Sequence, residues 1–410
     1  MELVNGKYQY DGGINPLEVG AQFGYPLYVY ESSVMKRQLE RLRNAFDVPK
    51  LKINYACKAL SNPGILKLFK KWGTGLDTVS INEVKLGLLS GFEPKEIIYT
   101  PNCVGIAEMS EAIKLGIRIN VDSIALLEEV GQKFPGVPLC LRINPHIMAG
   151  GNHKISVGHV DSKFGISFHQ MPHVYRIVES LGIEIEGIHM HTGSDIYDAE
   201  VFLIGAEILF DIAAHFPNVD YIDFGSGFKV AYKEGDISTD VESLGEQLSK
   251  RFNAFCKTYG KELTLAFEPG KYLVSEAGTF LTKVNVVKQT TASTFAGLDS
   301  GFNHLIRPMF YGAYHHILNI SNPQDKTRIY NVVGYICETD TFGSNRQLSL
   351  VREGDVLAFK NAGAYCFSMA SNYNSRLRPA EVLIHEGEAH LIRERESFDN
   401  LMENVVEIDL

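Results

Sequence analysis

The sequence predicts an α/β protein that combines a (β/α)8 barrel with a β-domain of sandwich or barrel type at its C-terminal end. Short apolar runs alternate with helical patterns from about residue 32 to about residue 274, which is typical of βα units around a parallel sheet. Beyond about residue 275, runs such as 280–290, 328–337 and 355–360 are separated by Gly, Asn and Asp turns. The length of 410 residues suits two such domains.

The first elements of the chain lie at residues 26–46. The run PLYVY at 26–30 has no preceding barrel strand to pair with, so we expect it to join the second domain. A helix should follow, because Ser32 and Ser33 can cap it and Val34, Met35 and Leu39 recur at helical spacing.

Eight strand candidates then follow in order. They are LKINYA at 51–56, GLDTV at 75–79, IIYT at 97–100, RINV at 118–121, PLCLRI at 138–143, IEGIHMH at 185–191, YIDFG at 221–225 and LTLAFE at 263–268. Eight βα repeats that end near Glu268 fit a closed barrel better than an open doubly wound sheet. The predicted domains are therefore a barrel at 32–274 and a β-domain formed by 1–31 and 275–410.

Composition limits the function classes. Hydrophobic residues make up 45% and charged residues 21%, as in average soluble globular chains, and the formal net charge of −10 argues against nucleic-acid or anionic-membrane partners. The six cysteines form no CxxC pair and no zinc-type spacing, so we expect no metal and a reducing, cytoplasmic location. The N-terminal stretch has no basic start followed by an apolar run, and we expect neither a signal peptide nor a membrane span.

Polar residues end several of the predicted barrel strands, where barrels carry their active sites. They are Lys58, Asp77, the pair His189 and His191, the run Gly225-Ser226-Gly227, and the run Glu268-Pro269-Gly270. A desolvated lysine at a strand end loses its proton more easily, and the neutral amine can form a Schiff base. The glycine turns can present backbone amides to a phosphate.

Each of these groups also has an ordinary structural explanation. Lys58 alone would more often be a snorkelling surface lysine, Glu268 half of a salt bridge, and His191 a hydrogen-bonded barrel histidine. Taken together, a lysine, a phosphate cradle, an acidic partner for a ring nitrogen and an imidazole that can stack on a ring describe a pyridoxal-phosphate site.

At this point the motifs carry a family resemblance that covers most of the chain, from about PLYVY to PAEVLI. YACKAL, HMHTGSD and EPGKYLVSEAG resemble the cofactor motifs of the fold-type III pyridoxal-phosphate decarboxylases, whose barrel is like that of alanine racemase. LDSGFNHLIRPMFYGAYH, CETDTF and AGAYCFSMASNYNSRLRPAEVL resemble the β-domain of the diaminopimelate decarboxylase family. The last three separate this branch from ornithine decarboxylases and alanine racemases.

The resemblance implies a role for each matching position. It implies cofactor contacts at Lys58, Asp77, His191, Ser194, Gly225, Gly227, Glu268, Pro269, Gly270, Lys271 and Tyr373. It implies substrate contacts at Lys271, Arg307, Tyr311, Glu338 and Tyr373. Lys58 would hold the cofactor, Glu268 would pair with the pyridine nitrogen and His191 would stack on the ring. Cys337 would be the proton donor, and it would reach the site from the second subunit of a homodimer.

The sequence departs from the family pattern at several positions. Lys271 stands where the family usually has Arg, and Lys keeps the charge but loses the planar bidentate grip on a carboxylate. Thr192 and Asp195 replace the usual Ile and Gln, Thr339 replaces a usual Ser, and Ser226 interrupts a usual triple glycine. None of these changes removes a group that the chemistry requires.

The expected reaction is decarboxylation of meso-diaminopimelate to L-lysine, a step of lysine biosynthesis. A substrate with a second amino-acid head needs one group of each sign at its distal end, and Arg307 and Glu338 supply that pair. The alternatives are a decarboxylase of the same branch that acts on carboxynorspermidine, on D-lysine or D-ornithine, or on a carrier-bound glutamyl group. An amino-acid racemase would need a basic tyrosine opposite Lys58, and a non-catalytic pyridoxal-phosphate-binding regulator would not need Lys58, Glu268 and Cys337 together.

Overall fold

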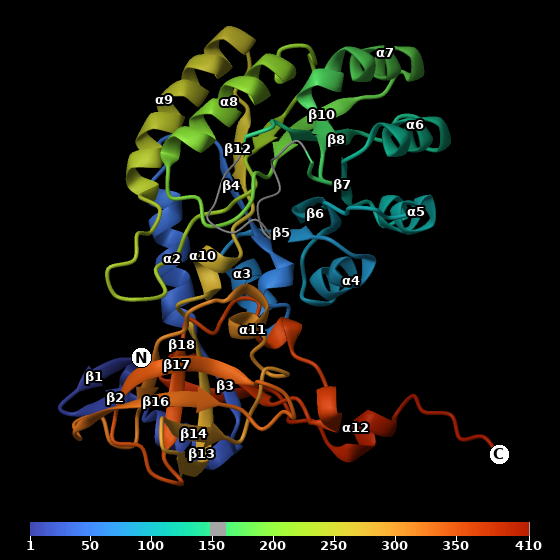
Figure 1. Cartoon of the computed structure of the whole chain (residues 1–410). Helices are drawn as coiled ribbons and strands as arrows, with labels where there is room; N and C mark the ends of the chain where they lie inside the picture. The colour runs from blue at the N-terminus through green and yellow to red at the C-terminus, as the bar shows by residue number, and fades with distance from the viewer. Residues whose placement is uncertain (148–160, 410) are drawn as a thin grey trace. The chain divides into compact units, whose positions relative to one another are not determined.

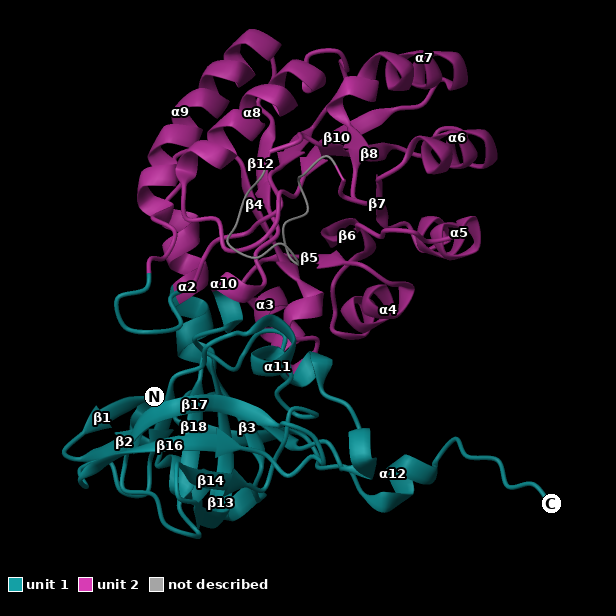
Figure 2. Ribbon diagram, in the orientation of Figure 1, with its two compact units in different colours: residues 1–37, 231–236, 273–410 teal, residues 38–230, 237–272 magenta. Residues whose placement is uncertain are grey.

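The computed structural model describes residues 1–147 and 161–409, which form two compact units (Figure 2). The barrel unit contains residues 38–230 and 237–272, and the β unit contains residues 1–37, 231–236 and 273–410. The domain boundaries expected from the sequence stay a prediction. In the structure, residues 231–236 belong to the β unit, although they lie within the range predicted for the barrel.

Eight parallel strands close the barrel of the barrel unit (Figure 1). In chain order they are β4 (Leu51–Ala56), β5 (Gly75–Thr78), β6 (Ile97–Tyr99), β7 (Arg118–Val121), β8 (Leu139–Asn144), β10 (Ile185–Met190), β11 (Tyr221–Asp223) and β12 (Thr264–Phe267). Pairing of β10 with β8 and of β12 with β4 completes the ring, and a short β9 (Ile166–Ser167) adds to β8. The predicted (β/α)8 barrel and all eight of its strands are confirmed.

Helices cover the outside of this barrel (Figure 1). They are α2 (Ser32–Asn44), α3 (Pro63–Lys71), α4 (Ile81–Leu89), α5 (Ile106–Lys114), α6 (Ile124–Lys133), α7 (Met171–Leu181), α8 (Ala199–Ala213) and α9 (Val241–Tyr259), and the short α10 (Lys271–Val274) follows β12. The start of α3 shows the local logic: the Asn62 side chain accepts a hydrogen bond from the Gly64 N–H, and Pro63 occupies the first turn. Its apolar face buries Ile65 and Phe69.

The β unit is built around a largely antiparallel sheet. Its strands are β3 (Leu27–Glu31), β13 (Gly278–Gln289), β14 (Thr294–Leu298), β15 (Ile317–Asn319), β16 (Thr327–Val333), β17 (Thr341–Ser349), β18 (Val356–Lys360), β19 (Ala380–His385) and β20 (Glu388–Arg393). A hairpin of β1 (Glu2–Val4) and β2 (Lys7–Gln9) and the helices α1 (Pro16–Phe23), α11 (Arg307–Tyr311) and α12 (Phe398–Met402) complete it. The predicted β-domain fold is confirmed, with strand order β17-β16-β14-β13-β3-β19-β20.

Strand β3 lies inside this sheet although it comes first in the chain. It pairs antiparallel with β13 and parallel with β19, and all five of its residues are buried. The side chains of Leu27, Val29, Leu281 and Val382 contribute to one apolar core cluster. The run at 26–30 therefore does join the second sheet, as the absence of an earlier barrel strand indicated.

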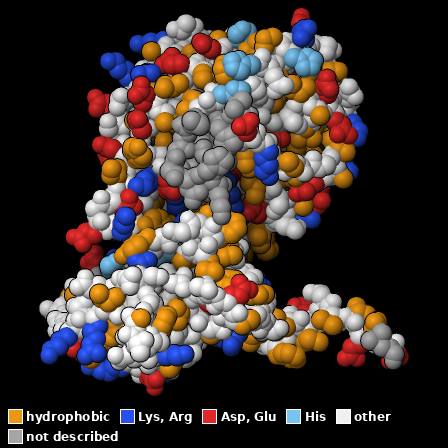
Figure 3. Space-filling model, viewed as in Figure 1, with side chains coloured by type: hydrophobic (Ala, Val, Ile, Leu, Met, Phe, Trp, Pro, Cys, Tyr) orange, Lys and Arg blue, Asp and Glu red, His pale blue; other side chains and the backbone are white. Residues whose placement is uncertain are grey.

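The charged surface and the character of the helices can be compared with what nucleic-acid and membrane partners require. Lys and Arg side chains alternate with Asp and Glu side chains over the face seen in Figure 3. Within the described ranges no helix is both long enough and apolar enough to cross a membrane. All six cysteines are free thiols.

Candidate active site

Four consecutive loops at the carboxyl ends of the barrel strands are joined by backbone hydrogen bonds. The Ile196 N–H, after β10, donates to the Gly227 carbonyl, after β11, at 2.8 Å. The Glu268 N–H donates to the Gly225 carbonyl at 2.6 Å, and the Ala56 N–H at the end of β4 donates to the Pro269 carbonyl at 3.2 Å. These bonds fix the loops that carry most of the predicted site residues.

Gly225 and Gly227 are glycines for steric reasons. Their φ angles are 60° and 125°, in the region that disfavours residues with a Cβ. A Cβ at Gly225 would lie 2.6 Å from the Met190 carbonyl oxygen, and one at Gly227 would lie 2.5 Å from the Gly193 carbonyl oxygen. The loops after β10 and β11 thus approach each other more closely than a residue with a Cβ at position 225 or 227 would permit.

Lys58 lies in a single 3-10 turn, Cys57–Ala59, directly after β4. Its side chain is exposed while both neighbours are buried, so the desolvation expected from its strand-end position is not found in the described structure. Its charge still acts on the site, because Lys58 is among the causes that lower the pKa values of Glu268 and His191. The barrel therefore places Lys58 at the predicted site, and the lysine side chain is exposed there rather than buried.

Glu268 follows β12 and forms the central side-chain hydrogen bond of the site with His189. Its Oε2 lies 3.0 Å from His189 Nε2, and both side chains are almost fully buried. Burial alone would raise the pKa of Glu268, but His189, Lys58 and Arg142 outweigh it and hold the pKa below its usual value. The other oxygen, Oε1, is buried and has no hydrogen-bond partner among the described residues.

Two further carboxyl groups lie near Glu268. Burial, and then the charge of Glu268, raises the pKa of Asp77 to about 8; its carboxylate accepts a hydrogen bond from the Thr100 hydroxyl. Burial and Glu268 also raise the pKa of Asp223 well above its usual value, and Asp223 accepts a hydrogen bond from the Gly225 N–H at 2.8 Å. Glu268 is thus the group that carries the negative charge of this cluster.

His191 lies just beyond β10 and faces the glycine loop. Its Nδ1 accepts a hydrogen bond from the Ser226 N–H at 3.2 Å, which leaves the ring proton on Nε2. Burial lowers the pKa of His191 well below its usual value, and the positive charge of Lys58 adds to this effect. The ring is therefore neutral near pH 7 and available for stacking.

Lys271 forms an ion pair with Asp195, which lies in the loop after His191. The lysine side chain is 8% exposed and the aspartate side chain 28% exposed. Ser194 lies in the same loop, and Pro269 and Gly270 are buried between Glu268 and Lys271. Of the residues that the resemblance implies for the phosphate, Ser194, Gly227 and Gly270 lie on these connected loops, whereas Tyr373 lies in the β unit.

The β unit holds a separate group of predicted residues. The Tyr373 hydroxyl donates to the Glu338 carboxylate, and the Asn374 side-chain oxygen accepts hydrogen bonds from the Cys337 N–H and Sγ, each at 3.3 Å. All of these side chains are exposed. Asp340 anchors the Cys337 turn from inside, since its carboxylate accepts from the Ile336 N–H at 3.0 Å.

Arg307 and Tyr311 lie together on α11, also in the β unit. The Arg307 guanidinium is buried and lies 5.6 Å from the centre of the Tyr311 ring, and also 5.6 Å from that of Tyr232. Such distances are those of cation–π contacts.

The sequence patterns did not single out a role for His189, Arg142, Asn374 or Asp340. His189 had a usable signal, because a second buried histidine two residues before His191 lies on the same face of its strand. Asn374 had none, because its contact with Cys337 joins residues 37 positions apart.

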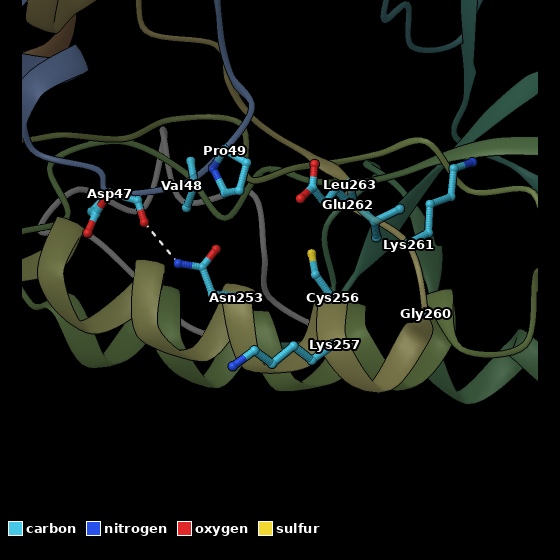
Figure 4. A pocket seen from close by; sticks show the side chains of 10 residues that line it. All are labelled: Asp47, Val48, Pro49, Asn253, Cys256, Lys257, Gly260, Lys261, Glu262 and Leu263. Atoms are coloured by element: carbon cyan, nitrogen blue, oxygen red, sulfur yellow. Dashed lines mark hydrogen bonds between the residues drawn. The ribbon is translucent and has the colours of Figure 1, made fainter.

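A hollow of about 650 Å³ lies elsewhere on the barrel unit (Figure 4). It is lined by Asp47–Pro49, by Asn253, Cys256 and Lys257 of α9, and by residues 260–263. These segments precede β4 and β12, so the hollow belongs to the amino-terminal end of the barrel. None of the predicted site residues lines it.

Comparisons with known proteins agree with this geometry. Residues 32–275 match the family model described as the pyridoxal binding domain of pyridoxal-dependent decarboxylases. The diaminopimelate decarboxylase of Methanothermobacter thermautotrophicus is 40% identical over 402 residues, which cover 95% of this chain and 94% of the relative.

Two solved structures have the same fold over nearly the whole chain. The diaminopimelate decarboxylase of M. jannaschii in complex with L-lysine superposes with a TM-score of 0.90 at 32% identity, covering 99% of this chain and 98% of that one. The Helicobacter pylori diaminopimelate decarboxylase in complex with L-lysine gives a TM-score of 0.88 at 30% identity, covering 95% and 98%.

Proposed function

The chain belongs to the pyridoxal-phosphate-dependent decarboxylases, in the family of the diaminopimelate decarboxylases, and from this membership we propose that it converts meso-diaminopimelate to L-lysine and CO2. It is a carboxy-lyase, and its cofactor is pyridoxal phosphate. The observation that best supports the proposal is the ionised, buried Glu268 with one oxygen that lacks a partner in the described structure. A protonated ring nitrogen would satisfy that oxygen.

The residues at the barrel end fit the cofactor in two further respects. The connected loops that contain Ser194, Gly225, Gly227 and Gly270 leave no room for a Cβ at these three glycines, so a phosphate could approach the bare backbone there. The neutral His191 ring can lie against a flat aromatic ring. Lys58 would hold the cofactor through its Nζ, with Asp77, Pro269, Lys271 and Tyr373 as further contacts.

The cofactor supplies an electron sink for the electron pair that remains when CO2 leaves. Glu268 would keep the ring nitrogen protonated, and the hydrogen bond with His189 would keep Glu268 oriented and favour its ionised form. The Cys337 thiol would then donate a proton to the carbon that lost the carboxyl group. Its hydrogen bond to Asn374 would orient Sγ for that step.

Substrate recognition would rest on charges of both signs. Arg307 would bind the distal carboxylate, Glu338 the distal ammonium, and Tyr311, Tyr373 and Lys271 would add further contacts. The relatives with 33–40% identity over the full chain are diaminopimelate decarboxylases, which supports this substrate over carboxynorspermidine, D-lysine, D-ornithine or a carrier-bound glutamyl group.

We also propose a homodimer whose active sites combine Lys58 of one subunit with Cys337 of the other, because a C2 pair makes such sharing reciprocal. The six free thiols suit a reducing compartment, and we place the enzyme in the cytoplasm.

A substrate panel tests the proposed reaction. CO2 release is measured with meso-diaminopimelate, D-lysine, L-lysine, ornithine and carboxynorspermidine. Release from meso-diaminopimelate should be faster than release from any of the others by a wide margin. Lys58→Ala is the control: it should abolish both CO2 release and the borohydride-stable attachment of the cofactor. A preference for another member of the panel would contradict the proposed substrate, and cofactor attachment to another lysine would contradict the role of Lys58.

A further inference from the structure

Asp195 and Lys271 form an ion pair that joins two loops at the carboxyl end of the barrel. We propose that Asp195 is a specificity-determining residue: it neutralises Lys271 and so weakens the chain's hold on the anionic group of the ligand that binds beside that lysine. This inference rests on the proposed function, because it presumes that a pyridoxal-phosphate decarboxylase site surrounds the pair.

The contact removes a positive charge that Lys271 alone would present. Lys271 and Asp195 form an ion pair, so the two side chains together have a formal charge of zero, whereas Lys271 alone has a formal charge of +1. Because the lysine side chain is only 8% exposed, water screens this change weakly.

The pair lies among the loops that the cofactor motifs form. Asp195 directly precedes Ile196, whose N–H donates to the Gly227 carbonyl, and directly follows Ser194. Lys271 directly follows Gly270, where a Cβ would lie 2.9 Å from the Cβ of Ala59, beside Lys58. A change of charge at the pair therefore acts on the site itself.

The neutralisation is effective because residue 271 is a lysine rather than an arginine. Arg presents five N–H donors in a planar fork and can hold two anionic partners at once, whereas Lys is a compact point charge. Asp195 and an anionic ligand group consequently compete for one ammonium group.

A structural explanation for Asp195 must be separated from this one. Its φ is 62°, a conformation that Asp and Asn adopt more readily than Gln, so the aspartate could serve the backbone alone. Asp195→Asn keeps that backbone preference and removes the charge, which makes it the discriminating variant.

The test measures equilibrium binding of two probe pairs that differ in one anionic group. The full-length chain freed of cofactor is titrated with pyridoxal phosphate and with pyridoxal, and the holoenzyme is titrated with L-lysine and with cadaverine. Asp195→Asn should tighten binding of the anion-bearing member of one pair by about tenfold at low salt, less at high salt, and leave its anion-free partner unchanged. The pair that responds identifies the anion as the cofactor phosphate or the substrate carboxylate.

Asp220→Asn is the matched control. It also removes one negative charge and one lysine contact from the barrel unit, because Asp220 pairs with Lys261, but this exposed pair precedes β11 at the opposite end of the barrel. It should change none of the four dissociation constants.

Each outcome is decisive for the inference. The inference is overturned if Asp195→Asn binds all four probes as the wild type does. It is also overturned if, in both pairs, the variant binds the anion-free probe more tightly by the same factor as the anion-bearing probe. Weaker binding of all four with a lower melting temperature also overturns it, because Asp195 would then serve the loop alone. If the wild-type chain binds no pyridoxal phosphate, the proposed function fails instead, which distinguishes the two failures.

Discussion

At the scale of single residues, three carboxyl groups share one buried end of the barrel, and they differ in charge because they differ in partners. Glu268 has His189 and the nearby cations, so its pKa is held down, whereas Asp77 has a hydroxyl group and the repulsion of Glu268. A site that must keep one acid ionised can thus contain other acids without accumulating negative charge.

This difference predicts a pH dependence of stability. In the unfolded chain Asp77 loses its proton near pH 4, but in the fold its pKa is about 8, so the wild type loses stability as pH rises between those values. Asp77→Asn cannot titrate and should be more stable than wild type by about 1–3 kcal/mol at pH 8.5, with little difference at pH 4.5. Urea unfolding of the cofactor-free protein across this range measures the gap.

Asp299→Asn in the β unit serves as the comparison, because burial raises the pKa of Asp299 to about 6. Its stability gap should therefore stop growing near pH 6 rather than pH 8. A gap for Asp77→Asn that stays constant with pH would mean that Asp77 is ionised in the fold.

The sequence predicted individual residues where strand position alone locates them. Glu268 and His191 follow strands whose apolar runs are unambiguous, and both lie at the expected barrel end. The environment of Lys58 could not be decided from the sequence, because strand position does not determine exposure, and its side chain is exposed in the described structure. Asn374 could not be predicted, because a loop-to-loop contact across 37 residues leaves no periodic signal.

At the scale of elements, the loops after β10, β11, β12 and β4 act as one connected rim. The alignment of these four loops depends on backbone hydrogen bonds that form only when the loops lie close together. One of these bonds runs from the Glu268 N–H to the Gly225 carbonyl. The rim therefore couples the glycine loop that we propose holds the phosphate to Glu268, the proposed partner of the ring nitrogen.

Gly225→Ala should break this coupling. The new Cβ would lie 2.6 Å from the Met190 carbonyl oxygen and 2.7 Å from His191 Nδ1, so the loop must shift, and its hydrogen bond with the Glu268 N–H is disturbed. We expect pyridoxal phosphate to bind about 10–100 times more weakly, a loss of about 1.4–2.8 kcal/mol.

The matched variant is Gly260→Ala, at the C-terminal end of α9. Gly260 also has a positive φ, 82°, but a Cβ there would meet nothing within 4 Å. Both variants incur backbone strain, so equal losses of cofactor affinity would show that strain, rather than the contact with the rim, is responsible.

The strands of the barrel were predictable because each is a short apolar run that pairs with neighbours close in sequence. The predicted helix at 32–46 ends two residues earlier than expected, at Asn44, which is the usual uncertainty of an uncapped end. The pairing within the β unit was not predictable: the pattern of 26–30 indicates a strand but contains nothing about β13 or β19 as partners.

At the scale of the whole molecule, the proposed sharing of sites in a dimer has a quantitative consequence. Lys58→Ala and Cys337→Ala should each be nearly inactive alone. Refolded together in equal amounts, about half of the dimers are mixed, and each mixed dimer has one intact and one doubly defective site. Activity should return to roughly a quarter of the wild-type value.

Native mass spectrometry of the same mixture shows whether mixed dimers have formed. Mixed dimers without recovered activity would remove Cys337 as a donor from the partner chain. The sequence of one chain could suggest this sharing through a family resemblance alone, because a side chain that acts across an interface leaves no pattern in its own strand or loop.

The position of β3 in the sheet of the β unit also bears on how the protein is made. On the ribosome, the barrel strands can assemble as they emerge, since most of them pair with their neighbours in sequence. β3 can pair with β19 only after β19 has been synthesised, about 350 residues later. At roughly 5–20 residues per second, this synthesis takes about 20–70 s. Until β13 has been made, this apolar strand has no partner, and any nascent chain that stalls between β13 and residue 380 still leaves the other edge of β3 open to chaperones or to other unfinished copies.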